Sequence, residues 1–292
     1  MSETQDSNTS ALRDPGIQPG VAVRLSPHVH RLTARNPGPM TGPGTNSYLV
    51  GSGEQWAIID PGPADDGHIQ ALVAAAPPPI RHILVTHTHP DHSPGATPLK
   101  SATGALLLGR TTSHHHWQDP TFCPDRELQH GDRLTLAAGA TLRVIHTPGH
   151  ASNHLCFLLE EERILFTGDH IIQGSTVVID PPDGDMAAYI RSLESLLREP
   201  LDYLAPGHGT LMPDPHAAIQ GLIRHRLRRE AKVLASLPRE RPADLPTLVK
   251  RVYNDVPSEL HPLATRSLLA HLLKLEAESR AIRIADSWTA PD

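Results

Sequence analysis

The residues best suited to do chemistry are concentrated in one run, His87-Thr88-His89-Pro90-Asp91-His92. Its imidazoles and its carboxylate are the ligand types that zinc and similar divalent ions select. The run follows the apolar segment 81–86, which has β-strand character, so these side chains fall where a strand ends and a loop begins. The chain has 20 histidines, which makes chance pairs common, but chance does not readily produce the ordered pattern HxHxDH at a strand end. The run predicts a site for one metal ion, or the beginning of two adjacent sites.

Four further segments place an acid or an imidazole where a predicted strand ends. Asp60 closes the apolar segment 58–60, and the other three side chains follow later apolar segments: His150, Asp169 and His208. Each of these three is preceded by a glycine, which permits a sharp turn at the end of a strand. Any one of these segments is weak evidence. Their order along the chain, with Asp60 before HxHxDH and the other three after it, predicts one composite site.

The elements that must position this site form an alternating pattern over the first two thirds of the chain. Short β segments bounded by turn residues are expected at 47–50, 56–60, 81–86, 134–136, 142–145, 155–159, 164–166 and 201–204. Helices are expected over 65–76, from about residue 96, and over 185–198, where Asp185 is the expected N-cap. Groups of strands with helices between and after them indicate a layered α/β domain.

The character of the chain changes near residue 215. One long, arginine-rich helical pattern covers 217–237, and two more helices are expected at 245–253 and 263–275, before a β segment at 281–284. Three helices followed by a short β element fit a small winged-helix unit. The predicted organisation is therefore a disordered tail over 1–20, a domain carrying the metal site over 21–215, and a winged-helix-like domain over 216–292.

Taken in order, these motifs resemble those of the metallo-β-lactamase superfamily, and the resemblance spans about residues 30 to 210. It implies an α/β fold, the αββα sandwich, with two zinc ions at one edge of the two sheets. The first ion would be held by His87, His89 and His150. The second would be held by Asp91, His92 and His208, and Asp169 would bridge both ions. Asp60 would orient the loop that carries the ligands without binding metal itself.

Seven histidine and aspartate ligands with no cysteine favour a catalytic site, since structural zinc sites are closed tetrahedral shells that often use cysteine. Two ions roughly 3.5–4 Å apart can hold a bridging hydroxide, lower its pKa and stabilise an oxyanion. We therefore expect a hydrolase in which Asp91 also orients the hydroxide. His154 is expected either to hydrogen-bond near the ligands or contact substrate, or to be an ordinary surface or core residue. His114 to His116 is interpreted as a solvated surface tract.

A narrower resemblance is to the group of metallo-β-lactamase-like protein 2, the β-lactamase-like endoribonucleases. It is carried by the loop 36–51, by Thr147-Pro148-Gly149-His150 with His154, and by the C-terminal helical unit with its segment 263–275. This group has a winged-helix-like domain after the hydrolase domain and includes single-strand RNA endonucleases. The resemblance therefore implies cleavage of a phosphodiester bond in single-stranded RNA as the leading hypothesis.

Charge and composition leave other functions open. Residues 216–292 carry 13 Lys and Arg against 9 Asp and Glu, which leaves 13 against 23 in the remainder. The basic C-terminal unit could bind RNA phosphates, but the metal-site domain is acidic and only 3% of residues are aromatic, which offers little surface for stacking bases. The alternative is hydrolysis of a small ester or thioester, as in glyoxalase II relatives that share THxHxDH. A β-lactamase and a nucleic-acid-binding regulator with a structural or sensing metal are less favoured.

The first ten residues contain two acids and no Lys or Arg, unlike a secretory signal or an organellar transit peptide. No apolar run approaches the roughly 18 residues of a membrane-spanning helix. These features predict a cytoplasmic protein with no membrane partner. In the ester or thioester hypothesis the C-terminal unit would shape the pocket or form the interface of a homodimer.

Overall fold

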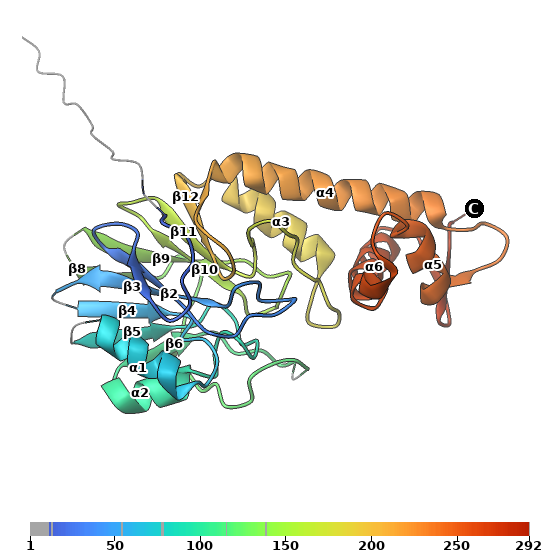
Figure 1. The fold of residues 1–292 in the computed structure, drawn as a ribbon. Helices are drawn as coiled ribbons and strands as arrows, with labels where there is room; N and C mark the ends of the chain where they lie inside the picture. Colours follow the sequence, from blue (N-terminus) through green and yellow to red (C-terminus); the bar gives the residue numbers. More distant parts are fainter. Residues whose placement is uncertain are drawn as a thin grey trace, which may run out of the picture.

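Two β-sheets lie face to face between layers of helices in the computed structural model, which describes residues 12, 14–53, 55–76, 79–114, 116–137 and 139–291 (Figure 1). The first sheet contains, in spatial order, β1 (Ala22–Arg24), β2 (Val29–Thr33), β3 (Asn46–Ser52), β4 (Gln55–Ile59), β5 (Ile80–Leu84), β6 (Leu106–Gly109) and β7 (Arg126–Glu127). The second contains β13 (Met212–Pro213), β12 (Tyr203–Pro206), β11 (Ile164–Gly168), β10 (Leu155–Leu159), β9 (Ala140–His146) and β8 (Arg133–Ala137). The predicted αββα sandwich is confirmed.

The core explains why the central strands have continuous apolar sequences. Successive side chains of a strand point to opposite faces. On β10, Leu155, Phe157 and Leu159 pack between the two sheets, whereas Cys156 and Leu158 pack outward beneath a helix. Because both faces of the strand are covered, the whole segment is apolar.

Helices cover the outer face of each sheet (Figure 1). On the first sheet lie α1 (Asp66–Ala75) and α2 (Ala96–Thr103), and on the second lies α3 (Met186–Leu196). Asp185 caps α3 as predicted, because its carboxylate accepts a hydrogen bond of 2.9 Å from the main-chain N–H of Ala188.

The sheet directions bring the candidate site together. Strands β4, β5 and β6 are parallel to one another, and so are β11 and β12. Asp60 follows β4, the run 87–92 follows β5, and Asp169 and His208 follow β11 and β12. The carboxyl ends of these strands therefore meet at one edge of the sandwich, where loops can carry functional side chains.

The C-terminal unit contains α4 (Pro215–Ser236), α5 (Leu245–Val252), the short helix η1 (Ser258–Leu260) and α6 (His261–Ala277), with a small sheet ordered β14 (Ala243–Asp244), β16 (Ser287–Thr289), β15 (Ile282–Ile284). The sequence predicted one β segment here, at 281–284, and the structure has two further short strands, β14 and β16. The C-terminal unit has a buried core of its own, which contains Trp288, Leu248 and Leu272. Helix α4 joins the two parts, since Ile219 packs with the outer face of the second sheet and Val233 packs in the C-terminal core (Figure 1).

Part of the segment predicted as a disordered tail over 1–20 is packed against the sandwich. Residues 1–11 and 13 lie outside the described residues. The Asp14 carboxylate accepts hydrogen bonds of 2.6 and 2.9 Å from the buried guanidinium of Arg31, and one of 2.8 Å from the main-chain N–H of Leu211. These contacts correct the prediction for the described end of the tail, because a buried arginine requires a partner for its charge.

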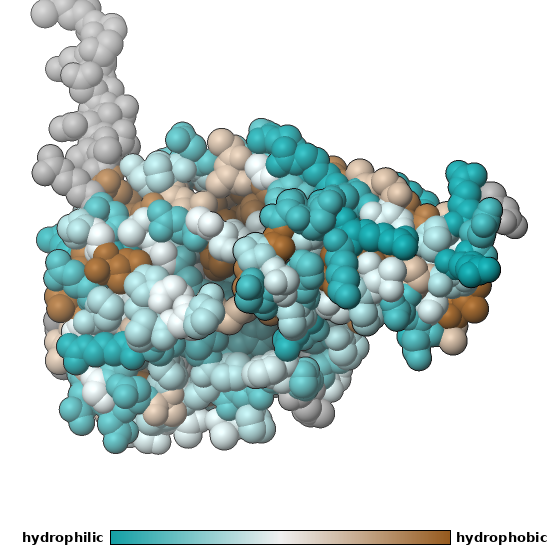
Figure 2. Space-filling model, turned by 45° about the vertical axis from the view of Figure 1, so that its right-hand side comes forward, coloured by the Kyte–Doolittle hydropathy of each residue, from teal (hydrophilic) through white to brown (hydrophobic). Residues whose placement is uncertain are grey.

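Exposed large hydrophobic residues among the described ones include Met40, Leu106 and Trp117. On the face shown in Figure 2, hydrophobic residues occur in separate patches among hydrophilic ones. Among the described residues, no helix combines the length and the apolar character that crossing a membrane would require.

Candidate metal centre

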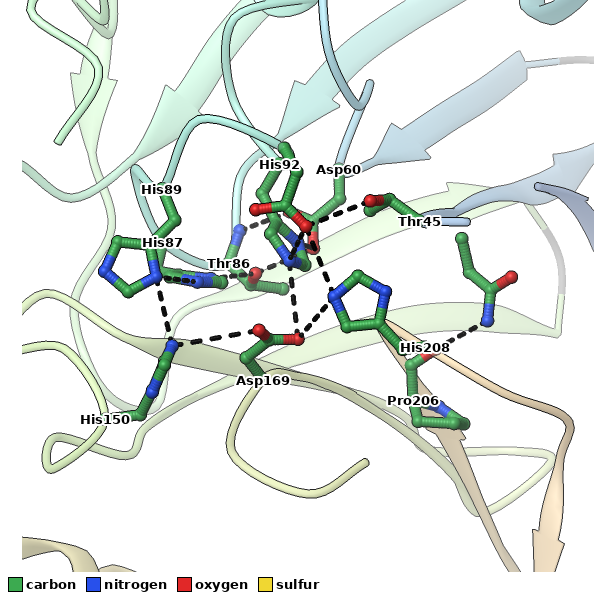
Figure 3. A network of polar contacts seen from close by, with 12 residues as sticks. Thr45, Asp60, Thr86, His87, His89, His92, His150, Asp169, Pro206 and His208 are labelled. Atoms are coloured by element: carbon green, nitrogen blue, oxygen red, sulfur yellow. Dashed lines mark hydrogen bonds and ion pairs between the residues drawn. The ribbon is translucent and has the colours of Figure 1, made fainter. Parts of the chain in front are cut away.

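Three imidazoles converge at the first half of the site (Figure 3). The Nε2 atoms of His87 and His150 each lie 3.0 Å from Nδ1 of His89. Two nitrogens that each lie about 2.1 Å from one zinc ion are roughly 3.4 Å apart in tetrahedral geometry. The spacing of these three nitrogens is therefore close to that of ligands around one ion.

A carboxylate and two imidazoles converge at the second half. Oδ2 of Asp91 lies 3.4 Å from Nε2 of His92 and 3.2 Å from Nε2 of His208. Their ligand atoms belong to one group that could hold a metal ion.

Asp169 lies between the two halves and turns one oxygen toward each. Its Oδ2 is 3.8 Å from Nε2 of His150, and its Oδ1 is 3.4 Å from Nε2 of His92 and 3.3 Å from Nε2 of His208 (Figure 3). This placement is the one that a bridging carboxylate requires. The structure thus brings all seven predicted ligands together, and their roles as ligands stay a prediction.

The far side of four of these imidazoles meets a hydrogen-bond acceptor. The Nδ1 partners are Thr86 Oγ1 at 3.0 Å for His87, Asp60 Oδ2 at 2.8 Å for His92, Val178 O at 2.7 Å for His150 and Gly44 O at 3.2 Å for His208. A carbonyl or a carboxylate can only accept, so the proton of the neutral ring lies on Nδ1, and Nε2 presents its lone pair to the site. Such contacts fix the orientation and the basicity of metal-binding histidines.

Asp60 is buried behind the predicted ligands. Its Oδ1 accepts a hydrogen bond of 2.7 Å from the main-chain N–H of Thr86, and its Oδ2 accepts one of 2.7 Å from the hydroxyl of Thr86 in addition to the bond from His92. Asp60 has φ +52°, a backbone conformation that is unfavourable for a residue with a side chain. Strain of this kind at the end of β4 persists only where surrounding contacts hold it.

The two halves differ in charge. Burial, followed by repulsion from His150, lowers the pKa of His89 to about 3, and burial also lowers the pKa of His87. Burial lowers the pKa of His208 too, but the carboxylates of Asp169 and Asp91 outweigh it and raise that pKa to about 10. The carboxylates therefore attract positive charge into a buried site, which a metal cation would supply.

Two buried polar atoms strengthen this fit. Nε2 of His92 and Oδ1 of Asp169 have no hydrogen-bond partner among the described residues. Buried polar atoms are rarely left unpaired, and an unpaired one indicates an unplaced ion or water. Together with a donor set of nitrogen and carboxylate oxygen, they show that the cluster is able to bind divalent metal.

Glycines preceding two ligands are required for different reasons. Gly149, before His150, has φ +143°, and a Cβ there would lie 2.3 Å from Cα of Tyr189 on α3. Gly207, before His208, is not required for its φ; a Cβ there would lie 2.8 Å from both Oδ1 of Asp169 and Cε1 of His92. At Gly207 the small size, not the sharp turn expected from the sequence, leaves room for the ligands.

A cavity of about 510 Å³ opens above the ligands and is closed partly by the C-terminal unit. His89, Asp91, His150, Asp169 and His208 line it, together with a set of apolar side chains: Met40, Trp117, Val178, Pro181, Pro182 and Leu263. Arg266 on α6 is the one Lys or Arg lining it among the described residues, and its guanidinium pairs with Asp180 at 3.1 Å. The cavity is thus mainly apolar, with little free positive charge.

His154 lies outside this cavity. It is fully buried, with its ring 5.0 Å from that of His87, and Thr147 Oγ1 is 3.0 Å from its Nδ1. By contrast, His114 and His116, interpreted from sequence as solvated surface, line the cavity, while His115 is outside the described residues.

Sequence reasoning missed two hydroxyls that touch the predicted ligands, that of Thr86 beside Nδ1 of His87 and that of Thr45. The hydroxyl of Thr45 donates a hydrogen bond of 3.0 Å to Oδ2 of Asp91. The only feature of the sequence that could have pointed to Thr45 is its place between Gly44 and Asn46, in a loop that leads into a predicted strand. The carbonyl of Val178 was also missed, and a main-chain acceptor leaves no signal in residue type.

The chain belongs to the metallo-β-lactamase superfamily, whose family model matches residues 40–208. It is a hydrolase of that superfamily, and a second model, the β-lactamase-associated winged helix domain, matches residues 245–288. Both matches agree with the fold and with the cluster at the sheet edge.

Similar proteins cover nearly the whole chain. A β-lactamase-like protein 2 homolog of Drosophila melanogaster is 34% identical, over 91% of this chain and 93% of that protein. An atrochrysone carboxyl ACP thioesterase of Aspergillus chevalieri is 32% identical, over 95% of this chain and 88% of that protein. The crystal structure of a metallo-β-lactamase family protein from Thermus thermophilus superposes with a TM-score of 0.76 at 22% identity, over 92% of this chain and all of that one.

Proposed function

We propose that this protein is a metal-dependent hydrolase of acyl thioesters or esters. The observation that carries the proposal is the cavity above the ligand cluster. Its walls are mainly apolar, and Arg266, the one lysine or arginine that lines it among the described residues, is already paired with Asp180. Such a cavity suits an apolar acyl group, since burying apolar surface is favourable. A polyanion would instead require several free cations.

The cluster would hold two divalent ions, and zinc fits a set of imidazoles and carboxylates. His87, His89 and His150 would hold one ion, Asp91, His92 and His208 the other, and Asp169 would bridge them. When bound, the metals would activate water and stabilise negative charge on the carbonyl oxygen. The same ligand types also suit iron, so the test of the proposal includes a measurement of which metal the protein binds and of how many ions it holds.

Asp91 would orient the attacking water. Its Oδ2 accepts a hydrogen bond from the Thr45 hydroxyl and lies 3.2 Å from Nε2 of His208, which would bind the same ion, whereas its Oδ1 has no hydrogen bond from a described residue. Because Asp91 also lines the cavity, that free oxygen could accept a hydrogen bond, and then a proton, from water placed beside the substrate carbonyl. Thr45 would thus keep the carboxylate in its productive orientation.

The relatives give this reaction independent support. A protein that shares 32% of its residues over nearly all of this chain is named an ACP thioesterase. A thioester joins an acyl group to the sulfur of a thiol, and hydrolysis would break the C–S bond and release a carboxylic acid and the free thiol.

RNA cleavage, the leading hypothesis from the sequence, becomes the second candidate. Trp117 favours it, because this side chain is 53% exposed at the cavity and could stack on a base. Two of the four arginines of α4 weigh against it, since Arg226 is buried and Arg229 pairs with Asp255 at 2.8 Å. These two residues are therefore not free to bind phosphates, whereas the other two, Arg224 and Arg228, are exposed.

The test is a direct comparison of substrates. Purified protein, loaded with zinc and assayed for metal content, is incubated with acyl-coenzyme A thioesters of increasing chain length and, separately, with a labelled single-stranded RNA. We expect thioester turnover that rises with acyl length, is abolished by a chelator, and falls at least roughly 100-fold in an Asp91→Asn variant that still binds metal.

Cleavage of RNA without thioester turnover would overturn the proposal in favour of the second candidate. Tight sequence-specific DNA binding without turnover of either substrate would instead indicate the regulator with a structural or sensing metal. Full activity in protein from which zinc, iron and other divalent metals have all been removed would exclude the metal-dependent mechanism.

A further inference from the structure

The segment Val177–Asp180 forms a wall of the cavity and contacts a predicted ligand. Val178 and Asp180 line the cavity. The main-chain carbonyl of Val178 accepts a hydrogen bond of 2.7 Å from Nδ1 of His150. The position of this short segment therefore sets the orientation of the His150 ring.

The C-terminal unit holds the same segment from the other side. Arg226 on α4 donates through Nη2 to the carbonyl of Val177. On α6, the hydroxyl of Ser267 accepts a hydrogen bond of 3.3 Å from the N–H of Ile179, and Arg266 donates one of 3.1 Å to Asp180. Three contacts at residues 177, 179 and 180 thus come from helices outside the sandwich, and the contact at residue 178 goes to His150.

Arg226 is unusual because it is a buried charged side chain with few partners. It is 3% exposed, its Nε has no partner among the described residues, and none of them offers it a carboxylate within ion-pair distance. Its guanidinium lies 5.2 Å from the ring centre of Tyr189 on α3, which contributes a cation–π interaction. Burying a charge with so few partners is costly, so the guanidinium depends on the Val177 carbonyl and the Tyr189 ring, and the position of residue 177 is tied to that of Arg226.

We propose that Arg226 is a positioning residue for His150, acting through the segment 177–180, and that Ser267 and Arg266 support it. The C-terminal unit would in this way tune a metal ligand that it does not touch. The inference rests on the ligand assignment made under the proposed function. Coupling between two sites is reciprocal, so metal bound by His150 would in turn stabilise the docking of α4 and α6 on this segment.

The test measures metal binding without any substrate. Zinc affinity is determined by competition with a chromophoric chelator for the wild type, Arg226→Met, Arg226→Lys and Ser267→Ala. Cobalt absorption spectra of each protein report the geometry of the ligands. Arg224→Met is the matched control, because Arg224 is exposed on the same helix.

We expect Arg226→Met to weaken zinc binding about tenfold and to change the cobalt spectrum, as is typical when the partner that orients a metal-binding histidine is disturbed. Arg226→Lys, which retains a cationic donor, should recover part of the loss. Ser267→Ala should produce a smaller loss in the same direction, and Arg224→Met none.

Wild-type affinity and an unchanged cobalt spectrum in both Arg226→Met and Ser267→Ala would overturn the inference. Should Arg226→Met fail to fold, Ser267→Ala and Arg266→Ala decide the question, and unchanged affinity and spectra in both would overturn it equally. Failure of the wild type to bind metal is a different result, which would overturn the proposed function itself.

Discussion

Asp60 holds His92 through a hydrogen bond of 2.8 Å between Oδ2 of the carboxylate and Nδ1 of the ring, although 32 positions separate the two residues. The other carboxylate oxygen accepts the main-chain N–H of Thr86, at the end of the segment that leads into the ligand run. One buried acid therefore fixes both the start of the run and the ring that ends it.

Replacing this acid should weaken metal binding without removing a ligand. In Asp60→Asn, the amide cannot accept through its nitrogen, so either Thr86 or His92 loses its partner. We expect zinc affinity to fall about 10- to 100-fold, measured by chelator competition. Asp66→Asn, on the exposed start of α1, is the control and should bind zinc as the wild type does.

The close approach of α3 to Gly149 predicts a stability effect. A Gly149→Ala substitution would place a methyl group 2.3 Å from Cα of Tyr189 and would force a residue with a side chain to adopt φ +143°. We expect a loss of about 3 kcal/mol in the free energy of unfolding, measured by urea denaturation. Gly221→Ala on α4 meets open space, so it should be neutral or stabilise the protein by up to about 1 kcal/mol. Equal stability of the two variants would contradict the packing described.

The contact between Asp14 and Arg31 predicts a dependence of stability on pH. Burial raises the pKa of Asp14, but hydrogen bonds from Arg31 and from the main chain of Leu211 outweigh it and lower that pKa below its ordinary value. The contact therefore stabilises the fold above pH about 4, the unfolded-state pKa, and the stabilisation is lost as the pH falls through the lower folded-state pKa.

Asp14→Asn should accordingly be less stable than the wild type by about 3 kcal/mol at pH 7, since it leaves a buried arginine without its charge partner. Urea denaturation at several pH values should show the difference shrinking below about pH 4. A difference that stays constant down to about pH 2 would show that the carboxylate charge is not what Arg31 requires.

Leu263 of α6 should influence which acyl groups are hydrolysed. It lines the cavity from the C-terminal unit, so Leu263→Asn would replace apolar wall with an amide. We expect kcat/KM to fall about tenfold for a long acyl thioester and to change little for an acetyl thioester. Leu227→Asn, at an exposed position on α4, is the control. An equal loss for both chain lengths would mean that Leu263 does not contact the acyl group.

The cluster could be predicted from the sequence because histidine and aspartate carry a chemical signature and lie at strand ends. The ligand roles of His150 and His208 came from the family resemblance, and the structure brings both side chains to the same sheet edge as the run 87–92. Thr45 and Val178 could not be predicted, since a hydroxyl and a main-chain carbonyl are common to many positions and act here only through long-range packing. The basic C-terminal unit was considered able to bind RNA phosphates, but the burial of Arg226 in it depends on where α3 and residue 177 lie in space, which the sequence does not reveal.

The long helix α4 carries the chain from the second sheet to a unit with its own core, and that unit supplies Leu263 to the cavity. The residues that would perform the reaction and some of those that would choose the acyl group are thus encoded in separate stretches of the gene. Substitutions in the stretch that encodes the C-terminal unit could therefore change the preferred substrate during evolution. The reaction chemistry would be inherited unchanged, provided that the contact from Arg226 is retained.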